Sequence, residues 1–448
     1  MLSRMFLKSS RTSHCDIFFY KIFCTRRRSI MKHLFNLNKM VIILLILTSA
    51  IIGCDDDCDD CDPDTQQTQD KLLQLLLDER VDRFDVVPGG ALAVIRPNDD
   101  ALVFTTGFSD KENQVVMEKD ATFRIGSVTK TFTALATMQL AQSGEITLDQ
   151  TIEELLPGIL GEQYHPQEIT VRHLLNHTAG VFSFTGDVMN WMVPYLLDPS
   201  VTFTPLELIG IANLYQPTGP IGSEWHYSNT HYILLGLIIE DVTGNTWEEE
   251  VRTRFIDPLG LQHTTVPETG DESMPSGYAH GYTNLYIETG GAAGGDSLVE
   301  FSEIEPSTTW SSGNMISSVG DLARWAKAIA EGELLNDEYQ GELLTFFDVS
   351  DNIKMGLGIV READYRILGH RGQIEAYDCA MMYMEDLGIS TASCVNSQIQ
   401  QIGPEYSNVE LLVMYDAFGV LREELPAIPA IQEIIPGLRP SGPPLTEY

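Results

Sequence analysis

Positive charge is scarce in this chain of 448 residues. Lysine and arginine together number 28 against 64 aspartates and glutamates, which gives a formal net charge of −36 at pH 7. Such acidity disfavours nucleic acids and anionic membrane surfaces as partners, because both are polyanions. The basic residues are concentrated before Cys54, so the rest of the chain is more acidic than the whole. No basic patch interleaved with aromatic residues offsets this charge, and no nucleic-acid partner is expected.

The apolar run near the N-terminus is too short to span a membrane comfortably. It covers residues 40–52, the length of the hydrophobic region of a signal peptide, and a short basic lead at 31–39 precedes it. Gly53 and Cys54 follow directly. A small residue before a cysteine at this point resembles a bacterial lipoprotein signal, in which cleavage leaves the cysteine as a lipidated N-terminus. A simple signal peptide and an N-terminal anchor helix are the alternatives.

This resemblance implies an exported lipoprotein that is anchored to the bacterial cell envelope through lipid on Cys54. Residues 1–53 would then be a leader that is removed. Residues 1–30 fit neither the basic lead nor the apolar run, so we expect Met31 to be the true start and the preceding residues to be a mis-assigned extension.

Cysteine is another scarce residue, with seven in the whole chain. Cys54, Cys58 and Cys61 have a spacing that can indicate a metal knuckle. However, they lie among aspartates, with no histidine or apolar core nearby. An acidic, solvated tether over residues 54–69 is the better interpretation.

The remaining chain has strand patterns at its two ends and helical patterns in the middle. Strands are predicted at 88–97, 101–108, 355–360, 365–370, 377–384 and 389–395. Helices are predicted at 71–83, 318–330 and 408–418, and a helical sub-domain at about 148–322. This pattern predicts an α+β fold: an antiparallel sheet built from the N- and C-terminal segments, flanked by helices, with a large helical insertion. The catalytic domain would span 70–420, and a proline-rich tail 421–448.

The most informative stretch runs from Phe123 to Met138 and reads as a loop entering a helix. Ser127 and Lys130 lie three residues apart, so they share a helix face. A serine hydroxyl needs a group that accepts its proton before it becomes a good nucleophile. A lysine can accept that proton if burial and the positive end of a helix lower its pKa. Ser-x-x-Lys alone is a weak signal, since it recurs by chance.

Two other polar motifs favour structural roles. His173 and His177 have the spacing of a zinc pair on a helix, but the glutamate expected beside the first histidine is absent and no third ligand is evident. A helix closed by Gly180 is the favoured interpretation. The glycine-rich segment 289–296 lacks the lysine and the strand context of a phosphate loop, and is predicted to be a surface loop. No metal and no cofactor are expected.

Three short boxes occur in order along the chain: Ser127-x-x-Lys130, Tyr227-Ser228-Asn229 and His370-Arg371-Gly372. Their order resembles that of the serine β-lactamase and D,D-peptidase superfamily. The tyrosine of the second box and the histidine of the third resemble the class C branch, with its D-alanyl carboxypeptidases and related esterases. The flanking sequences agree, and the resemblance covers roughly residues 71–418.

The resemblance implies a role for each box residue. Ser127 would attack a carbonyl and become acylated, and Lys130 would accept or relay its proton. Tyr227 would help to protonate the leaving group and then activate the deacylating water. Asn229 would hold a substrate amide or the lysine, and His370 would line the opposite wall. The alternative for Tyr227 is an ordinary buried tyrosine before a helix. The alternative for His370 is a strand histidine whose hydrogen bonds are satisfied within the fold.

The third box also implies an oxyanion hole and carries a departure from the family pattern. The backbone N–H groups of Ser127 and Gln373 would bind the oxyanion, at about 3 kcal/mol per donor, with Gly372 between His370 and Gln373 on the substrate-binding strand. Arg371 stands where a small hydroxyl residue is usual, and residues 373–376 replace small residues. This bulk and charge are predicted to reshape the acyl pocket.

The leading functional prediction is a serine hydrolase that acts through an acyl-enzyme. Its substrate would be a small molecule or peptide: a D-amino-acid peptide, a β-lactam or a small ester. The alternative is a non-catalytic binding or sensor protein that keeps the fold. The sequence does not rank these substrates, and it leaves the oligomeric state open.

Cys379 and Cys394 lie on two successive predicted strands, on either side of a turn at Asp386 and Leu387. This turn places the two cysteines directly opposite each other, on the same side of the sheet and within contact range. A disulfide is one outcome, since an exported protein meets oxidising conditions. Two small buried thiols that pack as hydrophobes are the favoured alternative.

Overall fold

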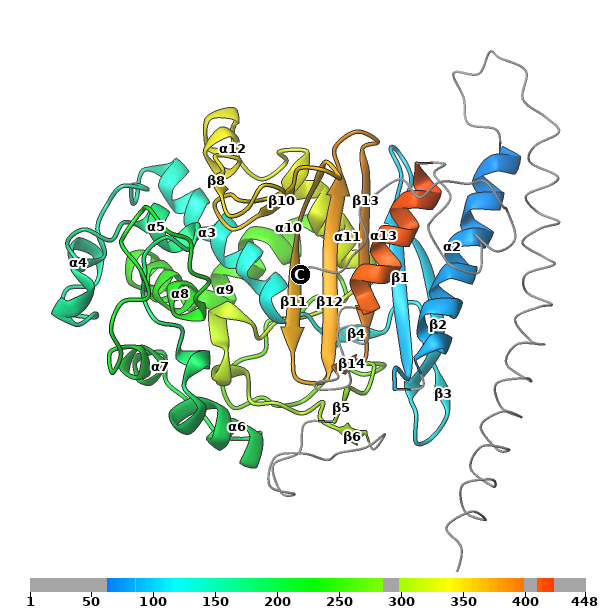
Figure 1. Ribbon diagram of the computed structural model, residues 1–448, viewed down its shortest axis with the longest axis horizontal. Coiled ribbons are helices and arrows are strands. Elements are labelled where there is room, and N and C mark those ends of the chain that lie inside the picture. The colour runs from blue at the N-terminus through cyan, green and yellow to red at the C-terminus, as the bar shows by residue number, and fades with distance from the viewer. Residues whose placement is uncertain (1–62, 85, 285–297, 399–408, 423–448) are drawn as a thin grey trace, which may run out of the picture. The chain divides into compact units, whose positions relative to one another are not determined.

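A nine-stranded antiparallel sheet, with the order β3-β2-β1-β13-β12-β11-β10-β9-β8, runs through the computed structural model (Figure 1). The structure describes residues 63–84, 86–284, 298–398 and 409–422. The predicted leader, the lipidation site Cys54, the 289–296 loop and most of the predicted tail lie outside these residues. The strands of the sheet are β1 (Gly89–Ile95), β2 (Leu102–Asp110), β3 (Val115–Val116), β8 (Phe347–Asp348), β9 (Ile353–Met355), β10 (Val360–Glu362), β11 (Ile367–Ile374), β12 (Tyr377–Met384) and β13 (Ile389–Val395).

The internal contacts divide the chain into two units. One consists of Met1–Leu72 and Leu425–Tyr448, of which only residues 63–72 are described, as the first part of helix α2 (Pro63–Arg83). The other, Leu73–Glu424, holds the sheet and everything discussed below. Helix α2 begins eight residues before the predicted Lys71, so residues 63–69 of the predicted tether are helical.

The two ends of the second unit meet in the centre of the sheet. Strand β1 pairs with β2 on one side and with β13 on the other, where Ala93 stands opposite Ala392. Strands β12 and β13 have the predicted bounds. The α+β class and an antiparallel sheet built from both ends of the domain are therefore confirmed.

The predicted strand at 355–360 is wrong, because the chain turns back on itself there. Strand β9 ends at Met355 and β10 begins at Val360, with Gly356 N–H bonded to Ile359 O at 2.8 Å. Gly358 has φ +94°, and a Cβ at this position would lie 2.2 Å from Ala134 Cβ. Two glycines therefore allow a tight turn against helix α3 (Thr129–Ser143).

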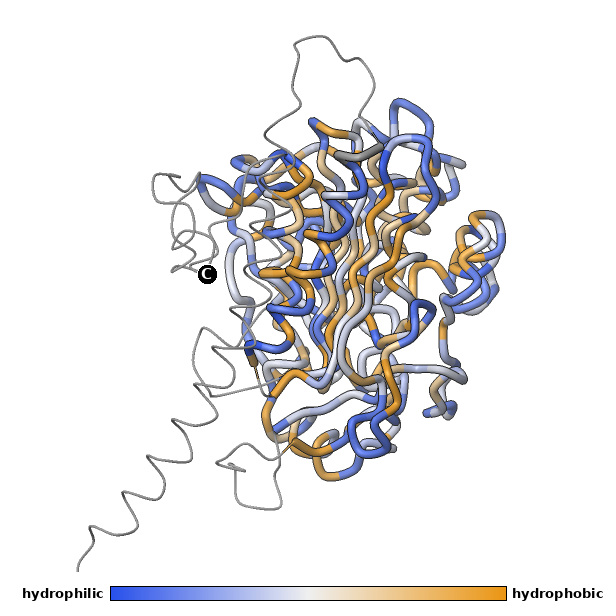
Figure 2. Tube along the Cα trace, turned by 90° about the vertical axis from the view of Figure 1, so that its right-hand side faces the viewer, coloured by the Kyte–Doolittle hydropathy of each residue, from blue (hydrophilic) through white to orange (hydrophobic). Residues whose placement is uncertain are grey.

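Helices cover both faces of the sheet (Figure 1). Helix α13 (Val409–Leu421) and the 73–83 part of α2 lie on one face, joined by a buried ion pair between Arg80 and Asp416. Helix α11 (Val319–Ala330) lies on the other face against β1, β12 and β13, and Ser318 caps its N-terminus. Both faces are thus buried, and apolar residues dominate the central strands while polar residues occupy the outer turns (Figure 2).

The predicted helical insertion packs beside β11 (Figure 1). Its longest helix, α8 (Asn229–Thr243), contacts α3, which precedes the insertion, and both are buried along most of their length. The other helices of the insertion are α4 (Ile152–Leu155), α5 (Val171–Leu175), α6 (Val193–Leu197), α7 (Pro205–Ala212), α9 (Trp247–Val251) and α10 (Asp257–Leu259), and α12 (Asp337–Leu343) follows it in the chain. Two small sheets complete the fold, formed by β4 (Thr122–Arg124) with β7 (Ile316–Ser318), and by β5 (Tyr282–Thr283), β6 (Val299–Glu300) and β14 (Ser397–Gln398). Among the described helices, none combines the length and the apolar character that crossing a membrane requires.

Cys379 and Cys394 are joined by a disulfide, so the favoured prediction of two free thiols is wrong. The two residues stand directly opposite each other on β12 and β13, with Cα atoms 4.2 Å apart, as the predicted register required. Both are fully buried. The Cys379 sulfur also lies 3.7 Å from Arg124 O, so the bridge is beneath the chain that leads into Ser127.

Candidate active site

Ser127 lies in a short 3-10 turn, Gly126–Val128, that leads directly into helix α3. This is the loop-to-helix position predicted from the sequence. Gly126 has φ +50°, a left-handed conformation that glycine adopts without steric cost. The turn keeps Ser127 partly exposed, whereas Gly126 and Val128 on either side of it are buried.

Lys130 is fully buried on the first turn of α3 and contacts the serine. Its Nζ lies 3.0 Å from Ser127 Oγ, 2.6 Å from Asn229 Oδ1 and 2.7 Å from Ser312 O. All three contacts are neutral groups. Because desolvation disfavours the charged amine, burial lowers the pKa of Lys130 well below its ordinary value of 10.5.

The contacts of Lys130 also orient the neutral amine. Asn229 Oδ1 and the carbonyl oxygen of Ser312 can only accept hydrogen bonds, so each takes one N–H of the lysine. The lone pair of a neutral Nζ is then left for the third partner, the hydroxyl of Ser127. Lys130 is thereby arranged to receive the proton of that hydroxyl.

Tyr227 contacts Ser127 from the loop that precedes α8. Its hydroxyl lies 2.8 Å from Ser127 Oγ, and its ring faces Lys130 Nζ at 5.0 Å. Although the residue as a whole is 39% exposed, desolvation of its hydroxyl raises the pKa of Tyr227 above its ordinary value of 10. The phenol therefore stays protonated at neutral pH and can act as a hydrogen-bond donor.

Asn229 binds the lysine rather than standing free for a substrate. Its Nδ2 donates to Thr185 Oγ1 at 2.9 Å, and its backbone N–H donates to Ser183 Oγ at 3.1 Å. These contacts fix Oδ1 toward Lys130. The sequence pattern did not identify Ser183, Thr185 or Ser312. Ser312 contacts Lys130 through its backbone oxygen, and the other two residues contact Asn229 and not the lysine.

Strand β11 forms the other side of the site, and its backbone touches the Ser127 turn. A Cβ on Gly372 would lie 1.8 Å from Ile125 O, and one on Gly126 would lie 2.7 Å from Gln373 O. Only glycines permit this approach of strand and turn. It brings the backbone of Gln373 beside the backbone of Ser127, where an oxyanion hole is predicted.

The two polar residues of the third box take different directions. His370 is buried, and its Nδ1 donates to Arg371 O at 2.5 Å, so Nε2 carries the lone pair of the neutral ring. Burial lowers the pKa of His370 to about 4. Arg371 instead donates to Glu410 Oε1 at 2.7 Å, at the start of α13 on the far face of the sheet. The Arg371 side chain therefore points away from the Ser127 side of β11, so the predicted effect of this residue on the acyl pocket is wrong, while that of residues 373–376 stays a prediction.

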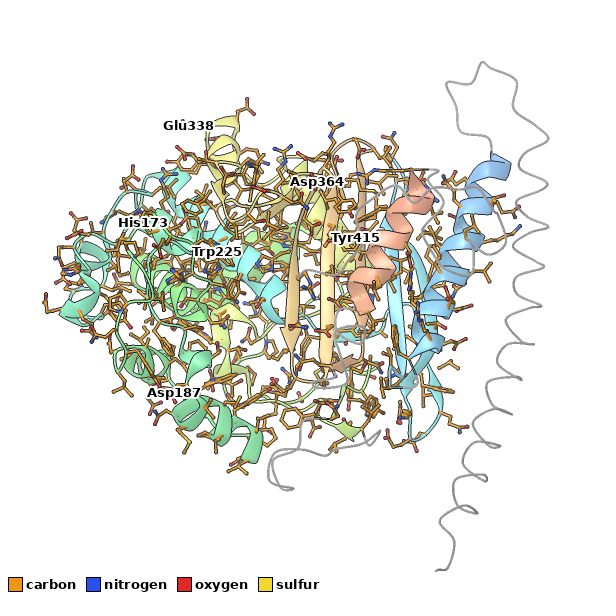
Figure 3. The ribbon with its side chains drawn as sticks, in the orientation of Figure 1. His173, Asp187, Trp225, Glu338, Asp364 and Tyr415 are labelled. Carbon is orange, nitrogen blue, oxygen red and sulfur yellow. A yellow bond between two sulfur atoms is a disulfide. The ribbon has the colours of Figure 1, made fainter. Side chains whose placement is uncertain are left out.

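The histidine pair at 173 and 177 does not share a helix face. Helix α5 ends at Leu175, earlier than the predicted Gly180, and His173 Nδ1 accepts the N–H of Thr170 in a capping box. His177 lies beyond the helix with φ +61°. Figure 3 labels His173 among the helices that lie beside the sheet. In the part of the chain that the structure describes, no three histidines, cysteines or acidic residues are grouped to hold a metal ion.

A serine that contacts a lysine and a tyrosine, at the edge of an antiparallel sheet with helices beside it, defines the serine β-lactamase and D,D-peptidase class of proteins. The family model described as Beta-lactamase matches residues 77–402. The chain belongs to this family.

Comparisons with individual proteins agree. A D-stereospecific amidohydrolase from Streptomyces sp. is 31% identical with a TM-score of 0.68, over 78% of this chain and 98% of that protein. The D-amino acid amidase from Ochrobactrum anthropi SV3, complexed with L-phenylalanine amide, is 26% identical with a TM-score of 0.66, over 82% and 99% of the two chains. Penicillin-binding protein 4 from Amycolatopsis lactamdurans is 33% identical over 42% of this chain and 49% of its own length. The chain thus spans about half the length of the curated relatives it matches.

Proposed function

We propose that the protein is a serine hydrolase that cleaves an amide carbonyl through an acyl-enzyme. Ser127 Oγ attacks the carbonyl carbon while its proton passes to Lys130, directly or through Tyr227. The oxyanion binds the N–H groups of Ser127 and Gln373. When the tetrahedral intermediate collapses, the C–N bond breaks, the leaving amine takes a proton from Tyr227, and Lys130 returns to Tyr227 the proton that it accepted. A water molecule then attacks the acyl carbon and its proton passes through Tyr227 to Lys130. The bond between the acyl carbon and Ser127 Oγ breaks, the acid leaves, and that proton returns to Ser127 Oγ.

One observation carries this proposal. Ser127 Oγ lies within 3.0 Å of a buried lysine that is oriented to accept a proton and within 2.8 Å of a tyrosine hydroxyl. A binding protein has no need to keep a lysine fully buried with only neutral groups in contact with its Nζ, since burying that amine costs free energy. The non-catalytic alternative therefore finds no support in the geometry.

The proposed substrate is an amide or short peptide of a D-amino acid. The amidohydrolase and the amidase named above match this chain over nearly their whole lengths; the first is named as D-stereospecific and the second as a D-amino acid amidase. A β-lactam and a small ester present the same electrophilic carbonyl to Ser127, so both serve as alternative substrates in the test.

We also propose that the protein is exported and lipidated on Cys54. Support comes from the leader pattern around residues 31–54. The disulfide between Cys379 and Cys394 fits an oxidising compartment outside the cytoplasm.

The test combines a substrate panel with a Ser127→Ala variant. D-amino-acid amides, D-Ala-D-Ala peptides, a chromogenic cephalosporin and chromogenic esters are assayed with both proteins. We expect turnover of D-configured amides by the wild type and none by the variant, and an acyl adduct at Ser127 in intact-mass spectra of the wild type alone. Hydrolysis by Ser127→Ala at a rate close to the wild type would contradict the assignment of the nucleophile.

A further inference from the structure

We propose that His177, which lies outside the three boxes, is a positioning residue for Tyr227. The inference rests on the function proposed above, since it matters only if the hydroxyl of Tyr227 acts on Ser127. His177 does not contact Ser127 in the structure, and it would act by fixing the place of the phenol.

His177 holds the chain on both sides of Tyr227. Its backbone oxygen accepts the N–H of His226 at 2.9 Å, and its side-chain Nδ1 accepts the N–H of Ser228 at 3.3 Å. One residue thus accepts the N–H groups of the two residues that flank Tyr227 in sequence. The two bonds help to define where the phenol projects.

The imidazole also packs against the phenol ring itself. The ring centroids of His177 and Tyr227 lie 4.4 Å apart with a tilt of 38°, and Tyr232 and Trp225 surround the imidazole at 5.2 Å and 6.2 Å. His177 is fully buried. A rigid ring behind the phenol prevents it from moving away from Ser127. Figure 3 labels Trp225 in this part of the molecule.

His231 on α8 fixes the orientation of the imidazole. The Nδ1 atoms of His177 and His231 lie 3.1 Å apart. Because His177 Nδ1 already accepts the N–H of Ser228, the shared proton belongs to His231, which donates it. This arrangement requires the ring of His177 to be neutral, because its Nδ1 must keep a lone pair to accept hydrogen bonds. Burial supports that state, since it lowers the pKa of His177 well below 6.5 and that of His231 to about 3.

The backbone of His177 is itself unusual. Its φ of +61° lies in the left-handed region, which is unfavourable for a residue other than glycine. Histidine occupies this position, although glycine or asparagine would adopt the left-handed conformation more easily. The strain is explained if the imidazole is needed where it lies.

His177→Asn tests this role, because asparagine tolerates the left-handed backbone but lacks the ring. His165→Asn is the matched control, since His165 also has positive φ, at +51°, and is exposed. The assay is the burst of a p-nitrophenyl ester: the burst amplitude counts folded active sites, and the steady phase reports deacylation. We expect His177→Asn to keep most of the burst amplitude and to lower kcat by about 10- to 100-fold, with KM unchanged or lower. His165→Asn should match the wild type.

A double-mutant cycle separates positioning from a merely structural role. In a Tyr227→Phe background, His177→Asn should lower kcat by less than about threefold, because the hydroxyl that it positions is already absent. His231→Phe, which keeps a ring but lacks the donor, should give a smaller loss of the same kind. A lower burst amplitude with an unchanged rate per active site, or an equal loss of kcat in both backgrounds, would overturn the role of His177. A wild-type protein with no burst and no acyl adduct on any carbonyl of the panel would instead contradict the proposed function.

Discussion

Gly372→Ala is the sharpest test of how strand and turn build the oxyanion hole. The added methyl group would lie 1.8 Å from Ile125 O and 2.9 Å from Val128 N, both of them backbone atoms that no side-chain rotation can move. An ordinary contact needs at least 3.4 Å, so β11 and the Ser127 turn must move apart by about 1.5 Å. A displacement of about 1 Å is enough to cost roughly 100-fold in rate, and loss of one oxyanion donor costs about 10²–10³ in kcat.

We therefore expect Gly372→Ala to lower kcat/KM on the best substrate by about two to three orders of magnitude. Overpacking should also reduce the free energy of unfolding, by about 1–3 kcal/mol, measured by denaturant titration. Gly210→Ala is the control, because its new methyl group would have no atom within 4 Å and Gly210 lies in helix α7. That variant should keep full activity and be slightly more stable. A Gly372→Ala protein with wild-type activity and stability would refute the close approach of β11 to Ser127.

Four further predictions concern Lys130 and the cysteines. The acylation rate of Ser127 should rise with pH until Lys130 loses its proton, and it should reach its plateau well below the ordinary lysine pKa of 10.5. A rate that keeps rising up to that pH would contradict a neutral lysine as the base. Lys130→Ala should slow acylation by about 10²–10⁴-fold. Replacing both Cys379 and Cys394 by alanine should lower the free energy of unfolding by about 3 kcal/mol, since the bridge closes a loop of 15 residues; an unchanged denaturation midpoint would show that the bridge is absent. Cys54→Ser should abolish incorporation of a fatty-acid analogue, and label retained on that variant would exclude lipidation at Cys54.

Much of the sheet was predictable because its inner strands combine continuous apolar runs with clear turn residues. Strands β12 and β13 are separated by Asp386, Leu387 and Gly388, which fixed both their bounds and the register of the two cysteines. The interpretation failed where glycine served packing instead of flexibility. Gly356 and Gly358 were read as part of a strand, yet they form a turn, in which Gly358 packs against Ala134 and Gly356 against the backbone of Leu343. Such contacts depend on distant residues and leave no local pattern.

The site divides in the same way. Ser127, Lys130, Tyr227 and Asn229 were identified because the motif specifies their side chains, and the structure brings these side chains together. The carbonyl of Ser312 was not, because any residue supplies a backbone oxygen. Arg371 was misjudged for a different reason. Side chains alternate along a strand, so Arg371 lies on the opposite face from His370 and Gly372. Only the structure shows that Glu410 lies on that face and accepts a hydrogen bond from the guanidinium.

Because β1 pairs with β13, the sheet can be completed only after nearly the whole domain has been synthesised. During synthesis, the nucleophile turn is made long before β11 and β13, which complete the central sheet and the wall opposite Ser127. Contacts between segments so far apart in sequence form slowly and only after both have emerged. A nascent or truncated chain that ends before β11 therefore presents a serine with no oxyanion strand beside it. We expect such chains to be inert as hydrolases and readily degraded, so that hydrolytic activity begins only once the whole domain has been synthesised.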